Sequence, residues 1–308
     1  MNIVHIGLPK TGTTTLQHAL FPAQQRFAYI GKVNNVYPKD VHELIERIGF
    51  QDSLEYDSAR TAALLAEIQD GSRPLIVSDE ILSVDGKADR RLVAERLNSL
   101  FGPAKVLIGL RAQPSMLQAL YFNYIRGSGE RVISFEGWLE RSYGSIRSPD
   151  IYRVGINYEP LVRTYEEIFG AENVVVLPFE LMSDTDSFFA TTLADLIGMP
   201  LAEVQAKLTS NVYNQRLTQR HLLAVRVQNL LPQGTNLALL GRDLLPSWLY
   251  EPIRRFVRSG RRVSSPDLPG DWPARVAAEC AQGNAAIETR KKVPLRALGY
   301  PVDGSGTA

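Results

Sequence analysis

Residues 1–16 read MNIVHIGLPKTGTTTL. An apolar run of strand type at 3–6 meets a turn of Gly, Pro and Lys, and three threonines then open an amphipathic helical pattern over 13–20. A strand, a tight loop and a helix in this order leave free backbone N–H groups at the start of the helix, where the helix dipole also favours negative charge. The segment therefore predicts an anion-binding loop directly after the first strand.

The loop differs from the Walker pattern G-x-x-x-x-G-K-[ST] at one position. Gly7 and Gly12 have the required spacing, but Thr13 stands where the pattern has lysine, and the lysine of the loop is Lys10. In nucleoside triphosphatases the lysine after the second glycine reaches the β- and γ-phosphates, and the following hydroxyl binds Mg²⁺. A lysine placed before that glycine reaches a different ligand atom, so we expect a site that needs no metal.

Short apolar runs alternate with longer helical patterns along the chain, which is typical of βαβ units with a parallel sheet. The strands expected are 3–6, 27–30, 75–78, 105–110 and 174–177. The helices expected are 13–20, 41–48, 58–69, 90–100, 115–125, 158–169 and 186–197, and beyond about residue 200 the main helical pieces are 215–231, 248–257 and 272–290. We predict one α/β domain over 1–300, a parallel sheet flanked by helices with a helical C-terminal part, and a disordered tail over 301–308.

The composition is that of an ordinary globular enzyme. The 308 residues are 44% hydrophobic and 22% charged, and the net charge of +1 gives no global field that would favour nucleic acid as a partner. A single cysteine, Cys280, excludes an internal disulfide and suits a reducing compartment. No run approaches the ~18 apolar residues of a membrane span and no leader pattern is visible, so we expect a cytoplasmic protein. The four histidines show no metal-ligand spacing, and no metal site is expected.

Residues 9–14, Pro-Lys-Thr-Gly-Thr-Thr, resemble the 5′-phosphosulfate loop of sulfotransferases that use 3′-phosphoadenosine 5′-phosphosulfate (PAPS). The position of the loop, directly after the first strand, is similar to that in the bacterial and Golgi carbohydrate sulfotransferases. The resemblance implies a P-loop-like fold and PAPS as co-substrate. It also implies a catalytic Lys10, which stabilises charge on the bridging oxygen as the S–O bond breaks. The cofactor-binding residues that it implies in this loop are Lys10, Thr11, Gly12, Thr13, Thr14 and Thr15.

Two carboxylates, Asp79 and Glu80, follow the expected strand 75–78. The carbohydrate-type members resemble this chain in placing a glutamate shortly after the second strand, and there it takes the proton of the acceptor hydroxyl. The resemblance implies Glu80 as this base, with Asp79 as the alternative. The other interpretation is structural, because Asp79 or Ser83 would also serve to cap a helical turn.

Arg111 ends the expected strand 105–110, where the family has an arginine that binds the 3′-phosphate of PAPS. A planar guanidinium suits phosphate because it donates two parallel hydrogen bonds. The family also has a serine eight residues later, but this chain has Ala119. Ser115, one turn earlier on the same helix face, is the expected replacement; otherwise 3′-phosphate affinity is weakened or the donor differs.

Ligands of open parallel sheets bind beyond the carboxyl ends of the strands, so we expect the loops 7–14, 78–83, 111–115 and 178–183 to converge. The predicted function is sulfuryl transfer from PAPS to a hydroxyl of a carbohydrate or glycolipid acceptor. One alternative is a P-loop nucleotide kinase or phosphotransferase. The other is a non-catalytic protein that binds a nucleotide or a membrane surface, because residues 248–262 combine arginines with large apolar side chains. Such a stretch would allow peripheral contact with the inner face of the membrane.

Overall fold

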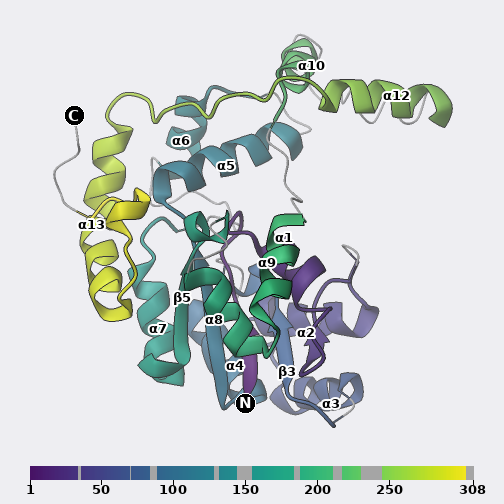
Figure 1. The fold of residues 1–308 in the computed structure, drawn as a ribbon, viewed down its shortest axis with the longest axis vertical. Coiled ribbons are helices and arrows are strands. Elements are labelled where there is room, and N and C mark those ends of the chain that lie inside the picture. The colour runs from purple at the N-terminus through teal and green to yellow at the C-terminus, as the bar shows by residue number, and fades with distance from the viewer. Residues whose placement is uncertain are drawn as a thin grey trace. The chain divides into compact units, whose positions relative to one another are not determined.

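The structure is a computed structural model that describes residues 1–33, 36–69, 71–83, 89–127, 132–143, 155–183, 188–210, 217–229 and 245–302 (Figure 1). The chain divides into two compact units. The first comprises 1–113, 149–213 and 273–308, and the second comprises 114–148 and 214–272. The prediction of a single domain over 1–300 stays a prediction. In the expected tail, Pro301 and Val302 belong to the described part, and 303–308 lie outside it.

A five-stranded parallel sheet organises the first unit. Its strands are β1 (Asn2–His5), β2 (Ala28–Ile30), β3 (Leu75–Ser78), β4 (Ala104–Leu110) and β5 (Val174–Pro178), in the spatial order β2-β3-β1-β4-β5. Val4 of the central strand is in register with Val77 on one side and Val106 on the other. Each strand lies within about a residue of its predicted range, and the predicted α/β fold is confirmed. The strands are mainly apolar, as expected for a parallel sheet that helices cover on both faces.

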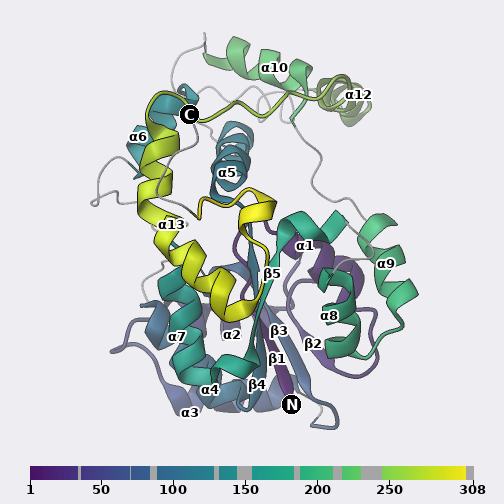
Figure 2. The same ribbon diagram turned by 60° about the vertical axis from the view of Figure 1, so that its left-hand side comes forward.

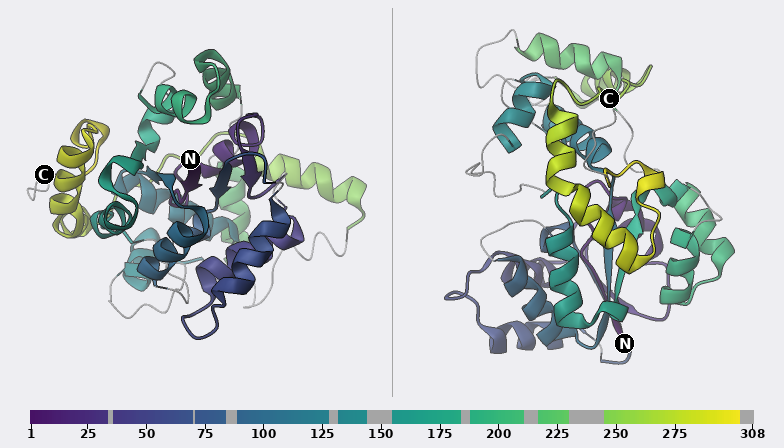
Figure 3. Two further views of the ribbon diagram at one scale, coloured as in Figure 1. Left: turned by 90° about the horizontal axis from the view of Figure 1, so that it is seen from below. Right: turned by 90° about the vertical axis from the view of Figure 1, so that its left-hand side faces the viewer.

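Helices pack on both faces of this sheet (Figure 2). One layer contains α2 (Lys39–Phe50), α3 (Ser58–Ile68), α4 (Arg90–Phe101) and α7 (Glu159–Phe169). The other contains α1 (Thr13–Thr15), the π-helical turn η1 (Leu16–Leu20), α8 (Phe188–Ile197) and α9 (Leu201–Ser210). The same two groups are visible in the right-hand view of Figure 3. The segment α9 is a separate helix that was not among the main predicted pieces.

The C-terminal part of the first unit consists of α13 (Trp272–Lys291) from residue 273 onward and the short turn η5 (Arg296–Leu298). Lys291 at the end of α13 pairs with Glu166 of α7 at 2.5 Å, and its ammonium also donates to the carbonyl of Ala171 in the 3-10 turn η3 (Ala171–Asn173) at 2.7 Å. These contacts fix the end of α13 against the segment that enters β5. The C-terminal residues therefore complete the first unit.

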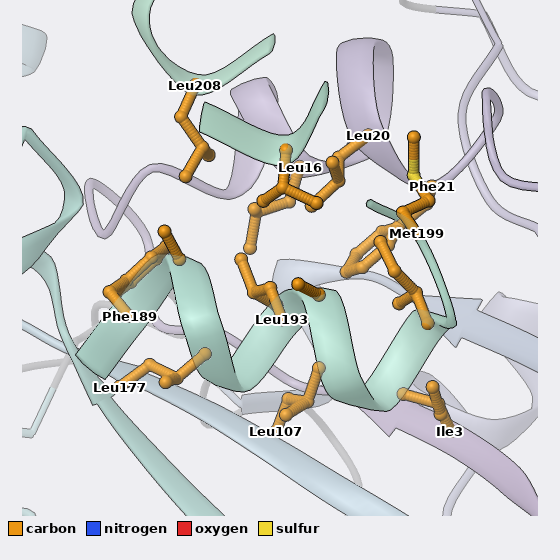
Figure 4. Close-up of a cluster of buried hydrophobic side chains, with 14 of the residues drawn as sticks. Ile3, Leu16, Leu20, Phe21, Leu107, Leu177, Phe189, Leu193, Met199 and Leu208 are labelled. Carbon is orange, nitrogen blue, oxygen red and sulfur yellow. The ribbon is translucent and has the colours of Figure 1, made fainter. Parts of the chain in front are cut away.

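A buried apolar cluster holds η1 and α8 onto the sheet (Figure 4). Leu16, Leu20 and Phe21 come from the segment directly after the predicted anion loop, and each is at most 2% exposed. Each such side chain contributes about 1.5–3 kcal/mol when it is removed from water. The loop between β1 and α1 is thus anchored at both ends, by the strand and by this cluster. The cluster's other members that are labelled in Figure 4 are Ile3, Leu107, Leu177, Phe189, Leu193, Met199 and Leu208.

The regular structure of the second unit, over its described residues, consists of helices and one isolated β-bridge between Thr218 and Arg262. Its helices are α5 (Gln113–Gly127, from residue 114), α6 (Phe135–Tyr143), α10 (Gln219–Asn229) and α12 (Ser247–Arg258). An aromatic group on α5 and α6 forms part of its interior: the rings of Tyr121 and Phe135 lie 4.8 Å apart, and those of Tyr121 and Trp138 lie 5.8 Å apart. Of all the helices that the structure describes, none combines the length and the apolar character that crossing a bilayer requires.

Candidate active site

The described parts of the predicted loops converge at the carboxyl edge of the sheet. Thr13, after β1, donates to Glu80, after β3, at 2.6 Å. Arg111, after β4, donates from Nη1 to the carbonyl of Lys10 at 3.0 Å. The amide of Ala112 donates to Glu180, after β5, at 2.9 Å. Three pairs of strand ends are therefore joined by hydrogen bonds in the first unit.

The loop after β1 turns tightly through left-handed backbone at two residues. Lys10 has a φ of 68° and Gly12 a φ of 82°. Thr11 Oγ1 donates to the carbonyl of Leu8 at 2.5 Å, and the carbonyl of Gly12 accepts the amide of Thr15 at 2.9 Å. The loop closes on itself and passes directly into α1. A side chain at Gly12 would overlap the sulfur of Met182, so Met182 would have to shift, and the left-handed φ itself favours glycine at this position.

Glu80 begins the 3-10 turn η2 (Glu80–Ser83) and is held by two donors. Thr13 Oγ1 lies 2.6 Å from one carboxylate oxygen, and Lys32 Nζ lies 3.2 Å from the other. Burial alone would raise the pKa of this carboxyl, but the charge of Lys32 and the hydrogen bond from Thr13 outweigh it and hold the pKa below its ordinary value. The side chains of Lys32 and Glu80 remain 24% and 23% exposed. Glu80 is thus an ionised carboxylate that a small molecule can reach.

Asp79, one residue earlier, has the opposite environment. Its side chain is fully buried, and its two oxygens accept from the hydroxyl of Tyr37 and, at 2.8 Å, from the amide of Ile81. Burial raises the pKa of Asp79, although Lys32 and these hydrogen bonds oppose the shift. The bond to Ile81 caps η2, which agrees with the structural interpretation that the sequence left open for Asp79.

His5 on β1 is buried beneath the same turn. Its Nδ1 lies 2.7 Å from Ser78 Oγ, and Gln17 of η1 donates to the same hydroxyl at 3.2 Å. Burial lowers the pKa of His5 to about 4, with Glu80 opposing the shift, so the ring is neutral at pH 7. His5 joins β1 and β3 beneath the site and carries no charge there.

Arg111, directly after β4, lies over an aromatic ring. Its guanidinium carbon is 4.6 Å from the ring centroid of Phe179, the first residue of the 3-10 turn η4 (Phe179–Ser183). The carbonyl of Arg111 accepts from the hydroxyl of Tyr158 at 2.7 Å. Stacking, the bond to Lys10 and the fixed backbone hold this cation beside the loop.

Glu180 connects three distant segments at this edge. One of its carboxylate oxygens accepts the amide of Ala112, and the other accepts the hydroxyl of Tyr300 at 2.9 Å. The C-terminal segment thereby supports the residue next to Arg111. This segment is held in turn by Asn284, whose amide donates to the carbonyl of Pro301 at 2.7 Å.

The structure brings together Lys10, Thr11, Gly12, Thr13, Glu80 and Arg111. Thr14 and Thr15 continue into α1, where Thr15 is buried. Ser115 and Ala119 lie on α5 in the second unit, so the role of Ser115 stays a prediction. Within the described residues, no group of three or more His, Cys, Asp and Glu side chains could hold a metal ion.

Sequence reasoning missed Lys32 and Tyr37. Lys32 lies two residues beyond β2, at the same edge of the sheet as the other strand ends. A cation directly after the short apolar run at 27–30 is a signal that could have been used. Tyr37 is 42 positions from its partner Asp79 in the sequence, and only the tertiary fold brings the two together.

The fold is similar to that of a sulfotransferase from Alicyclobacillus acidocaldarius, known from its crystal structure. The TM-score is 0.55 and the sequence identity 16%, and the match covers 96% of this chain and 98% of that chain. Neither models of protein families nor curated proteins gave a match to this sequence. The chain therefore has a sulfotransferase-like α/β fold.

Proposed function

We propose that this protein transfers a sulfuryl group from PAPS to a hydroxyl group of an acceptor, which we expect to be a carbohydrate or glycolipid. The observation that carries the proposal is the hydrogen bond of 2.6 Å between Thr13, at the start of α1, and Glu80. It joins the loop that contains Lys10 to a carboxylate that Lys32 holds ionised. A proton acceptor and an anion-binding loop then face the same reacting group.

In the proposed reaction the acceptor oxygen attacks sulfur in line with the departing phosphate oxygen. A new S–O bond forms, the S–O bond to the phosphate breaks, and the hydroxyl proton passes to Glu80. Lys10 and the loop amides stabilise the charge that develops on the departing phosphate. The two products are the sulfated acceptor and 3′-phosphoadenosine 5′-phosphate (PAP).

The hydrogen-bond donors of the site suit a nucleotide that carries phosphate groups at both its 5′ and 3′ positions. The loop of residues 7–14 would hold the 5′ end. Arg111, bonded to the carbonyl of Lys10 at 3.0 Å, would hold the 3′-phosphate, with Ser115 as the second proposed contact. Guanidinium groups bind phosphate through paired hydrogen bonds, and the stacking on Phe179 orients the plane of this one.

Thermal unfolding in the presence of nucleotides tests the donor. We expect PAP to raise the melting temperature by several degrees without Mg²⁺, since a ligand at about 100 times its Kd stabilises by about 2.7 kcal/mol. AMP, which lacks the 3′-phosphate, should give a much smaller shift, and Arg111→Ala should remove the difference between PAP and AMP. A shift with ATP and Mg²⁺ but none with PAP would contradict the proposal and favour a kinase or phosphotransferase.

A further inference from the structure

The helix α12 (Ser247–Arg258) in the second unit exposes its apolar face. Trp248 is 74% exposed, Phe256 60%, Ile253 45% and Leu249 37%. These positions fall on one side of the helix. An amphipathic helix of a globular protein normally turns such a face inward.

The side chains of α12 that are half-buried come from the opposite side of the helix. They are Tyr250, Glu251, Arg254 and Val257. Arg254 donates two hydrogen bonds to Glu251, at 3.0 and 2.7 Å, so charge is partly satisfied on this side. The helix thus presents its most apolar side to solvent, and a mixed polar and apolar side is half-buried. This arrangement costs free energy unless something apolar covers the exposed side.

Contacts with α10 (Gln219–Asn229) and with Thr218, directly before it, hold α12 in this orientation. Thr218 Oγ1 donates to the carbonyl of Val257 at 2.7 Å, and the guanidinium of Arg220 lies 4.0 Å from the ring centroid of Phe256. Leu223 and Val227 follow Arg220 by one and two turns on the same side of α10, and they are 61% and 46% exposed. The exposed apolar surface therefore continues from α12 onto its neighbour.

Positive charge is concentrated beside this surface. The stretch 247–262 contains five arginines and one glutamate, whereas the whole chain has a net charge of only +1. Arg255, Arg261 and Arg262 are exposed. A helix whose exposed aromatic and aliphatic side chains are flanked by exposed arginines is suited to the boundary between lipid headgroups and acyl chains.

We propose that α12 and the adjoining face of α10 dock on the surface of an anionic lipid bilayer. Trp248, Ile253 and Phe256 enter the acyl boundary, and Arg255, Arg261 and Arg262 contact phosphate groups of the lipids. Charge complementarity is the reason to choose a bilayer, since an uncharged apolar partner would leave the arginines without a role. The proposal is independent of the proposed sulfuryl transfer, because none of these residues belongs to the site at the strand ends.

Trp248 provides a direct reporter of docking. The chain has three tryptophans, and the other two, Trp138 and Trp272, are only 8% and 3% exposed. When the full chain is mixed with vesicles, a blue shift of its fluorescence reports mainly on Trp248. We expect this shift, and co-sedimentation, with phosphatidylcholine vesicles that contain about one-third phosphatidylglycerol, and loss of both as salt rises to about 1 M.

Matched variants separate the apolar and the basic contributions. Phe256→Ser should lower vesicle partitioning by about tenfold, and Leu54→Ser, at a residue 94% exposed in the first unit, should not change it. Arg255→Gln with Arg262→Gln should weaken binding to anionic vesicles, and Arg60→Gln, at an exposed residue of α3, should not. Unchanged melting temperatures and unchanged PAP binding would show that the variants retain their fold.

Equal binding to neutral and anionic vesicles, or no binding to either, would overturn the proposal. So would a concentration-dependent dimer that Phe256→Ser abolishes, because a second copy of the chain would then cover the surface. If PAP binding fails in every variant and in the parent protein, the proposed function is wrong, but the result with vesicles still decides this inference.

Discussion

Asp79 and Glu80 are adjacent carboxyl residues with contrasting chemistry. Burial raises the pKa of Asp79, whereas Lys32 and Thr13 overcome burial and lower the pKa of Glu80. Neighbouring acids whose pKa values are driven apart in this way are common where one group must accept a proton. The contrast keeps Glu80 ionised, as the proposed base must be, and leaves Asp79 with a structural role as cap of η2.

Replacing Lys32 tests how Glu80 is kept ionised. In Lys32→Met the carboxyl of Glu80 keeps its burial but loses the nearby cation, so the pKa of Glu80 should rise. A base must be deprotonated to act, so the acidic limb of the profile of kcat/KM against pH should move to higher pH. At pH values well above this limb, kcat/KM should change less. The profile is measured from about pH 4 to pH 8.

Lys39→Met is the control for this experiment, because Lys39 is an exposed lysine at the start of α2. Its pH profile should match that of the parent protein. If the acidic limb of Lys32→Met stays in place, Lys32 does not set the protonation of the base.

Lys10 should contribute to turnover far more than to folding. Lys10→Ala removes the proposed charge on the departing phosphate, and turnover should fall by about 100-fold or more. The circular dichroism spectrum should be unchanged, because alanine keeps the backbone carbonyl at residue 10 that accepts from Arg111. Lys39→Ala serves as the matched control. Turnover near the parent value in Lys10→Ala would remove this residue from the mechanism.

The loop between β1 and α1 depends on close packing against a neighbouring element. Gly12 combines a φ of 82° with contact against Met182 of η4, and Gly109 on β4 leaves room for Thr11. The shape of the loop is therefore decided by β4 and η4 as well as by its own glycines. This explains how a segment so short keeps one conformation.

Gly12→Ala should be more destabilising than an equally strained glycine substitution elsewhere. Gly71 has a φ of 69°, and no atom of the described residues lies within 4 Å of a Cβ placed there. Gly71→Ala should therefore cost about 1–2 kcal/mol, from backbone strain alone. Gly12→Ala adds the overlap with Met182 and should cost about 1–3 kcal/mol more. Urea unfolding measures both, and equal losses would contradict the packing argument.

Helices and strands with strong hydrophobic periodicity were predictable from the sequence. The neighbours against which each of them packs were not. The five strands and most helices follow from apolar runs and helical spacing, because local sequence sets these periods. The helix over 248–257 was predicted in the same way, and α12 is observed at Ser247–Arg258. That its apolar side faces solvent depends on how α10 and α12 pack, which periodicity does not contain.

Residues far apart in the chain support the site together. Tyr300 near the C-terminus donates to Glu180, which holds the amide of Ala112 beside Arg111. Tyr300→Phe removes one donor to a carboxylate and should cost about 1–3 kcal/mol in the free energy of unfolding. Because the backbone beside Arg111 loosens, KM for the proposed donor PAPS should rise several-fold while kcat changes little. Urea unfolding and steady-state kinetics measure the two effects.

Tyr165→Phe is the control for Tyr300→Phe. Tyr165 is equally buried, and within the described part of the chain its hydroxyl has no hydrogen-bond partner. Its replacement should leave both stability and KM close to the parent values. If both variants behave alike, the bond between Tyr300 and Glu180 does not support the site.

The sequence by itself determined the α/β class, the succession of strands and helices along the chain, and the loop that carries Lys10, Gly12 and Thr13. These features depend on local spacing and on the turn chemistry of a few neighbouring residues. Only the tertiary structure decided that Lys32 meets Glu80, that Tyr37 meets Asp79 and that Tyr300 meets Glu180. Each of these pairs joins residues at least 42 positions apart. Parallel strands and their crossover helices bring such residues to one edge, and no local pattern records that approach.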